Sequence, residues 1–225
     1  MFEWKKKAKK MQRKPLSQQG KKQQSNFSRT LTKILRHTGK KEGLKFREDG
    51  YCKVEDILKH KGVSKFQCDE YDVRFTVENC DKQRMSLSEI DGELFIKANQ
   101  GHSIKFEELE LTPIKSVEDV PRAVHGTYYK SWPFIQKDGL KTMGRTHIHF
   151  AVGEYGSKDV ISGMRKTCEV LIYLDIQKCL DDGIPLEISP NKVVLSIGDK
   201  NGSILPKYFS KVVDLATGKD VEFDK

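Results

Sequence analysis

The stretch RMSLSEIDGELFIKAN, residues 84–99, decides how the N-terminal half of the chain is built. Two short extended runs, residues 84–89 and 93–99, flank the tripeptide IDG. Its Asp91-Gly92 pair is a strong signal for a tight turn between antiparallel strands. The sequence therefore predicts a β-hairpin at this point.

Helical patterns precede this hairpin. In residues 25–37, SNFSRTLTKILRH, four apolar residues recur at helical spacing: Phe27, Leu31, Ile34 and Leu35. Asn26 or Ser28 is available to cap the start of this helix, and Gly39 suits a left-handed stop. A turn at residues 49–50 leads into a second predicted helix. Helices followed by a hairpin indicate a winged-helix-like unit, a shape often used to hold nucleic acid.

The C-terminal half has a β-rich pattern. Short runs rich in Val, Ile, Tyr and Phe alternate with Gly, Pro, Asp and Asn: residues 123–129, 147–152, 168–176, 191–197 and 208–215. Helical turns are expected in SWPFIQKDGL, ending at Gly139, and in DIQKCLDDG. The fold class is therefore predicted as α+β. We expect a basic arm over residues 1–27, a helical lobe over 28–112, a connector over 113–120 and a β-rich lobe over 121–225.

Composition limits the classes of protein that the chain can belong to. With 225 residues, 36% of them hydrophobic, the chain is long enough to bury one large core or two small ones. No apolar run approaches the length of a bilayer span, and the N-terminus lacks the apolar centre of a secretory signal. The five cysteines form no CxxC pair, which favours free thiols in a reducing compartment. We expect a soluble intracellular protein, cytoplasmic or nuclear.

Most of the positive charge lies at the N-terminus. Residues 1–28 carry nine Lys or Arg against Glu3 alone, so this segment supplies +8 of the net charge of +9. The other 197 residues carry only +1. The segment is also rich in Gln, Ser and Gly, as flexible arms are. An import signal, a non-specific RNA tether and a solubilising tail all stay open as its role.

Several histidines stand in contexts that suggest a ligand site. His125 opens the tripeptide HGT, in which Gly126 lets a backbone approach a ligand and Thr127 offers a hydroxyl. His102 follows a predicted strand in the polar turn NQGHS. His147 and His149 flank one residue of an extended run, and we expect them to point to opposite faces, which disfavours a shared metal ion. No metal site is therefore predicted.

Arginines are the second group of candidates. Arg84, Arg145 and Arg165 occur where lysine is otherwise the usual basic residue, which hints at bidentate recognition of an oxyanion. Structural salt bridges are the competing interpretation. Arg36 and His37 end the first predicted helix, where cations complement the negative end of the helix dipole. Taken alone, that dipeptide needs no functional explanation.

Six ordered motifs change that interpretation: LRH, DKQR, ANQGHS, HGT, GRTHIH and SGMR. In this order, and over residues 28 to about 213, they resemble the tRNA 2′-phosphotransferase family. That family removes the 2′-phosphate left at a splice junction, with NAD as the acceptor of the phosphate. The resemblance implies a winged-helix RNA lobe joined to a lobe of the ADP-ribosyltransferase fold, and a 2′-phosphorylated RNA, tRNA above all, as partner. We expect the chain to be a monomer.

The resemblance also implies which residues form the site. The catalytic group is implied to be Arg36, His37, Arg84 and Arg165. The residues implied to hold NAD are His125, Gly126, Thr127, His147, Ser162 and Gly163. Those implied to contact the RNA are Lys82, Gln100 and His102.

The resemblance further implies a reaction in two steps. The 2′-phosphate attacks the anomeric carbon of the nicotinamide ribose and expels nicotinamide, which joins the RNA to ADP-ribose through its phosphate. A ribose hydroxyl then attacks the phosphorus and releases 2′-hydroxyl RNA and ADP-ribose cyclic phosphate. Two alternatives stay open: a non-catalytic module that binds RNA or ADP-ribose, and an ADP-ribosyltransferase that acts on phosphorylated nucleic-acid ends.

Overall fold

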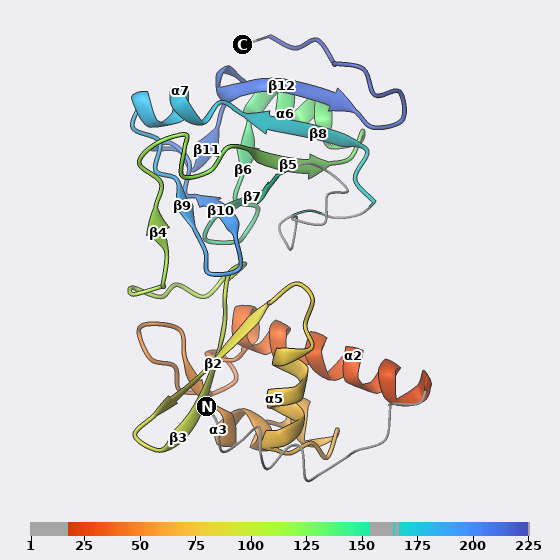
Figure 1. Cartoon of the computed structure of the whole chain (residues 1–225), viewed down its shortest axis with the longest axis vertical. Helices are drawn as coiled ribbons and strands as arrows, with labels where there is room; N and C mark the ends of the chain where they lie inside the picture. Colours follow the sequence, from red (N-terminus) through yellow and green to blue (C-terminus); the bar gives the residue numbers. More distant parts are fainter. Residues whose placement is uncertain (1–17, 154–163, 165–166, 225) are drawn as a thin grey trace.

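The computed structural model describes residues 18–153, 164 and 167–224. Figure 1 shows the N-terminal half, with its helices and one sheet, below the larger C-terminal sheet. Helices and strands both contribute to the molecule, so the predicted α+β class is confirmed. The predicted site residues Ser162, Gly163 and Arg165, together with residues 1–17 of the predicted arm, lie outside the described residues.

The N-terminal half contains helical segments and a small antiparallel sheet. The elements are α2 (Gln18–Lys33), η1 (Ile34–Thr38), β1 (Cys52–Lys53), α3 (Val54–Lys59), α4 (Lys61–Ser64), α5 (Glu70–Glu78), β2 (Met85–Ile90) and β3 (Glu93–Ala98). The strand order is β1-β3-β2. Strands β2 and β3 pair from Met85 opposite Ala98 to Ile90 opposite Glu93. The predicted hairpin is confirmed, and its Asp91 and Gly92 both have positive φ.

The first helix begins earlier than predicted. Helix α2 already includes Gln18, so Asn26 and Ser28 lie inside the helix and do not cap it. Their carbonyls accept hydrogen bonds from the hydroxyls of Thr30 and Thr32, each at 2.8 Å. Gln and Lys are good helix formers, and they extend the helix into the predicted arm. Residues 18–27 of that arm are therefore helical.

The C-terminal half is built on one seven-stranded antiparallel sheet. Its elements are β4 (Thr112–Pro113), β5 (Ala123–Thr127), α6 (Trp132–Asp138), β6 (Leu140–Lys141), β7 (Ile148–Val152), β8 (Val170–Leu174), α7 (Ile176–Asp181), β9 (Glu187–Ile188), β10 (Val193–Ser196), β11 (Ser203–Ile204), η2 (Pro206–Tyr208) and β12 (Phe209–Asp214). The order in the large sheet is β12-β8-β5-β7-β10-β9-β4, and β11 pairs with β6 in a separate ribbon. The predicted extended runs all form strands.

The predicted connector takes part in this sheet. Strand β4 pairs with β9, so Pro113 lies in an edge strand, where its missing N–H costs little. Ile114 and Val120 are buried in the main core of the C-terminal half. The lobe boundaries stay a prediction, but these residues pack with the second half.

Candidate active site

Arg36 and His37 lie in one π-helical turn, η1, which directly follows α2. The N–H of Gly39 donates to the carbonyl of Ile34 at 2.8 Å, a bond across five residues that closes the wider turn. Single π-turns in helices are rare, and those that do occur are frequently found at functional sites. The sequence placed the end of the helix correctly, but it gave no indication of this turn.

Gly39 is required for close packing. Its φ and ψ are −54° and −43°, which is right-handed, so the prediction of a left-handed stop is wrong. A Cβ at this position would lie 2.9 Å from the carbonyl oxygen of Ile34 and 2.9 Å from the ring of Phe46. Because Phe46 packs directly against the turn, only glycine fits here.

Two of the three guanidinium nitrogens of Arg36 are buried without an acceptor among the described residues. Its Nε and Nη2 atoms have no hydrogen-bond partner among the described residues. Burial first, and then the positive charges of Arg145 and Arg84, lower the pKa of Arg36 to about 10. A buried cation without a partner is costly, and an anionic ligand would offset that cost. The arrangement is typical of a site that binds an oxyanion.

Gly101 lies against this guanidinium. A Cβ on Gly101 would be 3.3 Å from Cζ of Arg36, and its φ of +84° is in the left-handed region. Both features call for glycine, since the backbone approaches the planar group closely. The NQGHS turn therefore forms one wall for the Arg36 side chain.

The residues after Gly101 also hold the π-turn. The N–H groups of Ser103 and Ile104 donate to the carbonyl of Arg36 at 2.9 and 3.3 Å. The Ser103 hydroxyl lies 3.1 Å from Nδ1 of His37. Burial first, and then Arg145 and Arg36, lower the pKa of His37, so its imidazole is mainly neutral at neutral pH. Ser103 thus orients a neutral imidazole beside the buried arginine.

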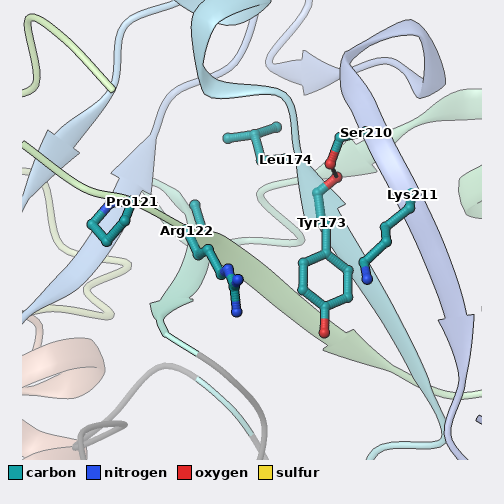
Figure 2. A pocket seen from close by; sticks show the side chains of 7 residues that line it. Pro121, Arg122, Tyr173, Leu174, Ser210 and Lys211 are labelled. Carbon is teal, nitrogen blue, oxygen red and sulfur yellow. Dashed lines mark hydrogen bonds between the residues drawn. The ribbon is translucent and has the colours of Figure 1, made fainter. Parts of the chain in front are cut away.

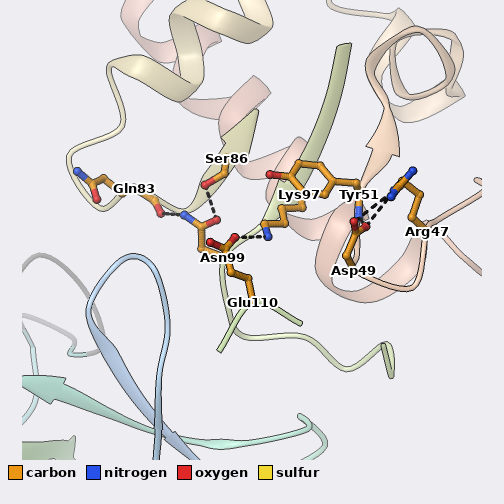
Figure 3. Close-up of polar contacts among 8 residues, drawn as sticks. All are labelled: Arg47, Asp49, Tyr51, Gln83, Ser86, Lys97, Asn99 and Glu110. Carbon is orange, nitrogen blue, oxygen red and sulfur yellow. Dashed lines mark hydrogen bonds and ion pairs between the residues drawn. The ribbon is translucent and has the colours of Figure 1, made fainter. Parts of the chain in front are cut away.

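Arg84 is positioned by Asn99, which the sequence analysis did not single out. Figure 3 shows Asn99 between Gln83 and Ser86: its amide donates to the Gln83 carbonyl at 2.7 Å, and the Ser86 hydroxyl donates to its Oδ1 at 2.7 Å. Its backbone N–H donates to the Arg84 carbonyl at 3.0 Å. Asn99 therefore fixes the loop that presents Arg84.

The side chains of Arg36, His37 and Arg84 line one cavity of about 230 Å³. Its lining residues are Ser28, Arg29, Thr32, Lys33, Arg36, His37 and Arg84. Three of the four predicted catalytic residues are thus brought together, and the fourth, Arg165, lies outside the described residues. Sequence reasoning missed Arg29 and Lys33, although their spacing of four residues, continued at Arg36, marks one helix face.

The residues predicted to contact RNA are placed less directly. Gln100 and His102 are buried, with 7% and 1% of their surface exposed, and neither they nor Lys82 line the cavity. Burial, followed by Arg36 and His147, lowers the pKa of His102 to about 3. The His102 ring packs edge-on against Phe106. His102 is therefore a neutral, buried residue beneath the site.

The backbone carbonyls of His102 and Lys82 connect the two halves of the molecule. The His102 carbonyl accepts from the N–H and the hydroxyl of Thr146, at 2.9 and 3.2 Å. The side-chain amide of Asn191, which is fully buried, donates to the Lys82 carbonyl at 3.2 Å. Backbone atoms of the predicted RNA-contacting residues therefore anchor the N-terminal half to the C-terminal sheet.

The HGT residues do not form one open surface. His125 places Nδ1 2.9 Å from the His149 carbonyl and packs edge-on against Phe150. Gly126, its neighbour in the strand, faces the other way: a Cβ there would lie 2.8 Å from Sγ of Cys168 and 2.8 Å from Cγ of Met164. Thr127 is 5% exposed. The space beside Gly126 is thus filled by side chains of the chain itself.

His147 lies directly before β7 and His149 lies within it. The expectation that they point to opposite faces is wrong, because side chains two residues apart on an extended chain project to the same face. Burial, then Arg145 and then His147 lower the pKa of His149 to about 3. The Nε2 atom of His149 is buried without a partner in the described part of the chain. Nδ1 of His147 lies 2.8 Å from the Thr146 hydroxyl.

Arg145 belongs to this group, although the sequence left its role open. Its charge lowers the pKa values of Arg36, His37 and His149. Arg145 therefore lies close to both walls of the site, one from each half of the chain. Together with Arg36 and Arg84 it makes the site strongly positive.

Within residues 18–153, 164 and 167–224, no group of three or more His, Cys, Asp or Glu is placed to hold a metal ion. None of the five cysteines, all of which are described, forms a disulfide. Every helix in the described part of the chain is too short or too polar to span a bilayer.

The sequence profile of the RNA 2′-phosphotransferase, Tpt1 / KptA family matches residues 22–198, which include every side chain of this site. The chain belongs to this family. Arg36, His37 and Arg84, which the motifs singled out, all lie within the matched range.

Individual members of the RNA 2′-phosphotransferase family match over most of the chain. The tRNA 2′-phosphotransferase 1 of Danio rerio is 45% identical over 189 residues, 82% of this chain and 83% of the relative. The tRNA 2′-phosphotransferase of Saccharomyces cerevisiae is 33% identical over 203 residues, 87% of this chain and 86% of the relative. A relative from Schizosaccharomyces pombe is 44% identical over 188 residues, and this match spans half of its length.

The Arg36 cavity is not the only basic cavity in the described residues. A second cavity of about 240 Å³ is lined mainly by residues of β5, β8 and β12 and their flanks: Pro121, Arg122, Ala123, Tyr173, Leu174, Ser210 and Lys211. Figure 2 shows Arg122 and Lys211 on either side of the Tyr173 ring. The Lys211 ammonium lies 4.5 Å from the centre of that ring. None of the predicted site residues lines this cavity.

Proposed function

We propose that the chain removes the 2′-phosphate that ligation leaves at the splice junction of tRNA, with NAD as the acceptor of the phosphate. One observation carries this proposal. Arg36, His37 and Arg84 line a single cavity, and Nε and Nη2 of Arg36 are buried without a partner among the described residues. Family membership and the names of the relatives support the same activity.

The two arginines hold the 2′-phosphate. A phosphate dianion is already nucleophilic, so its attack on the NAD ribose needs positioning more than a base. In the later attack on phosphorus, negative charge grows on the phosphoryl oxygens. Donors aimed at such charge contribute on the order of 2.7 to 4 kcal/mol each. Arg36 and Arg84 supply these donors, and Arg165 is proposed to add a third from the other half of the chain.

His37 moves a proton in the second step. The ribose hydroxyl that attacks phosphorus must lose its proton, and a neutral imidazole accepts one. The lowered pKa of His37 keeps the ring neutral at physiological pH. Because Ser103 lies 3.1 Å from Nδ1, the Nε2 atom is left to face the substrates. Ser103 is therefore a positioning residue for His37.

The residues around β7 fit NAD as a co-substrate. The Nε2 atom of His149 is buried without a partner in the described part of the chain, and Arg145 adds positive charge next to it. A dinucleotide with its diphosphate offers acceptors for both. When bound, NAD supplies the ribose carbon that the phosphate attacks. His125, Gly126, Thr127, His147, Ser162 and Gly163 are proposed to complete this subsite.

The two halves of the chain have different proposed binding roles. We assign the RNA to the N-terminal half as a winged-helix-like lobe, because η1 carries Arg36 and the loop before β2 carries Arg84. We assign NAD to the C-terminal half as a lobe of the ADP-ribosyltransferase type. The basic N-terminal segment adds electrostatic attraction for RNA, and the chain works as an intracellular monomer.

A product assay tests the proposal. The protein is incubated with a 2′-phosphorylated oligonucleotide and NAD, and the RNA products are resolved; the 2′-hydroxyl oligonucleotide and a reaction without NAD are the controls. We expect 2′-hydroxyl RNA, nicotinamide and ADP-ribose cyclic phosphate, with no requirement for a divalent metal. RNA that stays joined to ADP-ribose would instead indicate an ADP-ribosyltransferase, and binding without any product would indicate a non-catalytic module.

Two variants separate the steps. His37→Ala and Arg84→Ala remove groups assigned to the second step, so both should release nicotinamide and accumulate RNA joined to ADP-ribose through its 2′-phosphate. If they bind both substrates, release no nicotinamide and form no branched RNA on a gel, this division of roles is wrong.

A further inference from the structure

The turn Thr142–Arg145 connects the β6 ribbon to the site and has an unusual tip. The N–H of Arg145 donates to the Thr142 carbonyl at 3.2 Å, and Met143 and Gly144 have φ values of +52° and +80°. Turns with two successive positive φ values strongly favour Asn-Gly or Gly-Gly, because a side chain is strained in the left-handed region. A methionine at the first position is therefore unfavourable in the free protein.

Nothing in the described part of the chain compensates for this strain. Met143 is 86% exposed, more than any other large hydrophobic residue that is described. The other non-glycine residues with positive φ among the described ones are all polar: Gln67, Gln83, Asp91 and Lys192. A Cβ placed on Gly144 would have no atom within 4 Å, so the tip stands in open space. Solubility and local conformation both disfavour the residue that is present.

Both ends of the turn are fixed. On one side, Lys141 pairs with Ser203 in the ribbon of β6 and β11. On the other side, Thr146 donates twice to the His102 carbonyl, which ties the turn to the wall that holds Arg36. Arg145 lies between the tip of the turn and Thr146. It acts electrostatically on Arg36 and His37. Met143 is thus held on a turn that is anchored to the segment packed against Arg36.

We propose that Met143 is the platform for a nucleobase of the RNA substrate, on a nucleotide next to the one that carries the 2′-phosphate. A thioether is flexible and polarisable and packs well against aromatic rings. Arg145, two residues from Met143, acts electrostatically on Arg36 and His37, so an RNA strand whose 2′-phosphate lies in the Arg36 cavity can place an adjacent base on Met143. This inference rests on the proposed function, because it requires an RNA substrate at this site.

Kinetics of a turn variant test the proposal. Met143→Asn supplies the residue that the turn prefers, so Tm should rise by about 2–4 °C while the KM for 2′-phosphorylated RNA rises about two- to tenfold. The KM for NAD should not change. Met143→Leu keeps an apolar side chain and should keep the RNA KM within about twofold of the wild type. Gln67→Asn, at another φ of +52° and outside the cavity lining, is the matched control for strain and should leave both KM values unchanged.

Modified RNA substrates provide a second test. Oligonucleotides in which the 5′ or the 3′ neighbour of the 2′-phosphorylated nucleotide is abasic identify the base that packs on Met143. With that base removed, wild type and Met143→Asn should have equal RNA KM values. An unchanged RNA KM in Met143→Asn overturns the inference while the wild-type activity stands. A rise in the KM for NAD alone also overturns it, since the platform then serves a ring of NAD. A wild-type chain that releases no 2′-phosphate overturns the proposed function and this inference together.

Discussion

Two cavities of nearly equal size, about 230 and 240 Å³, carry arginine and lysine in different physical states. In the first, Nε and Nη2 of Arg36 are buried and have no partner among the described residues. In the second, Lys211 is exposed and lies 4.5 Å from the Tyr173 ring centre. The presence of cations alone is therefore a poor guide to a site, and the desolvation of a cation is a better one.

The physical reason is the local dielectric. Exposed charges are screened by water and salt, so an anion gains little by approaching them. A desolvated guanidinium interacts far more strongly with an anion, and it is unfavourable when no anion is present. The first cavity should thus bind an anion strongly but lower the stability of the free protein. The second cavity should have neither effect.

Arg36→Gln should separate the two cavities most clearly. Removing the cation should lower kcat/KM for 2′-phosphorylated RNA by about 10²- to 10³-fold, as for a donor aimed at developing charge. The same change should raise Tm, because a buried cation without an acceptor is removed. Activity assays and thermal unfolding of one preparation measure both. A variant that loses activity and also melts earlier would show that Arg36 mainly supports the fold.

Gly101→Ala should have a smaller effect through geometry alone. The new Cβ would lie 3.3 Å from Cζ of Arg36 at a φ of +84°, so the guanidinium and the turn must both shift. We expect kcat/KM to fall about tenfold and stability to fall by about 1 kcal/mol or more. Gly92→Ala, at a φ of +78° with no atom near its Cβ position, is the matched control. It should lower stability without a comparable loss of activity.

The surroundings of the first cavity should also respond to pH. The pKa values of His102 and His149 are about 3, mainly because both rings are buried. Below about pH 6.5 these two histidines bind protons in the unfolded chain, whereas in the folded chain they stay neutral until the pH approaches 3. Stability should therefore fall as the pH drops toward 3, by up to about 1.4 kcal/mol per pH unit for each ring. Urea unfolding between pH 7 and 5 measures the slope.

His102→Gln should flatten that slope, whereas Lys211→Gln, in the second cavity, should not. An equal slope in the wild type and in His102→Gln would mean that His102 protonates without loss of the fold.

Lys211→Gln should have the smallest effect on catalysis. Because its charge is exposed and screened, kcat/KM should change by less than about twofold. Steady-state kinetics at low and high salt measure this. A tenfold loss would show that the second cavity takes part in RNA binding and that the comparison between the cavities is wrong.

Local features of the fold could be predicted from the sequence. The hairpin at Asp91-Gly92 and the end of α6 at Gly139 follow from turn chemistry over a few residues, and both were found. The π-turn could not be predicted, because the residues that contact it, Phe46 at Gly39 and Ser103 at the Arg36 carbonyl, come from other parts of the sequence. The early start of α2 was missed because capping residues were weighted above the helix propensity of Gln and Lys.

The site was predictable where motifs name residues and not where tertiary contacts position them. Arg36, His37 and Arg84 come together as the family motifs imply. Asn99 and Ser103 act through hydrogen bonds to distant backbone and side-chain atoms, which no local pattern shows. The roles of Arg165, Ser162 and Gly163 stay predictions.

The central claim is that the buried Arg36 cavity recognises the 2′-phosphate itself. Calorimetric titration without NAD, using the same oligonucleotide with a 2′-phosphate or a 2′-hydroxyl, tests it most directly. The wild type should bind the phosphorylated RNA about 10- to 100-fold more tightly, as expected for charge-assisted hydrogen bonds, and Arg36→Gln should lose about tenfold of that preference. Equal binding of the two RNAs by the wild type, or an unchanged preference in Arg36→Gln, would contradict the claim.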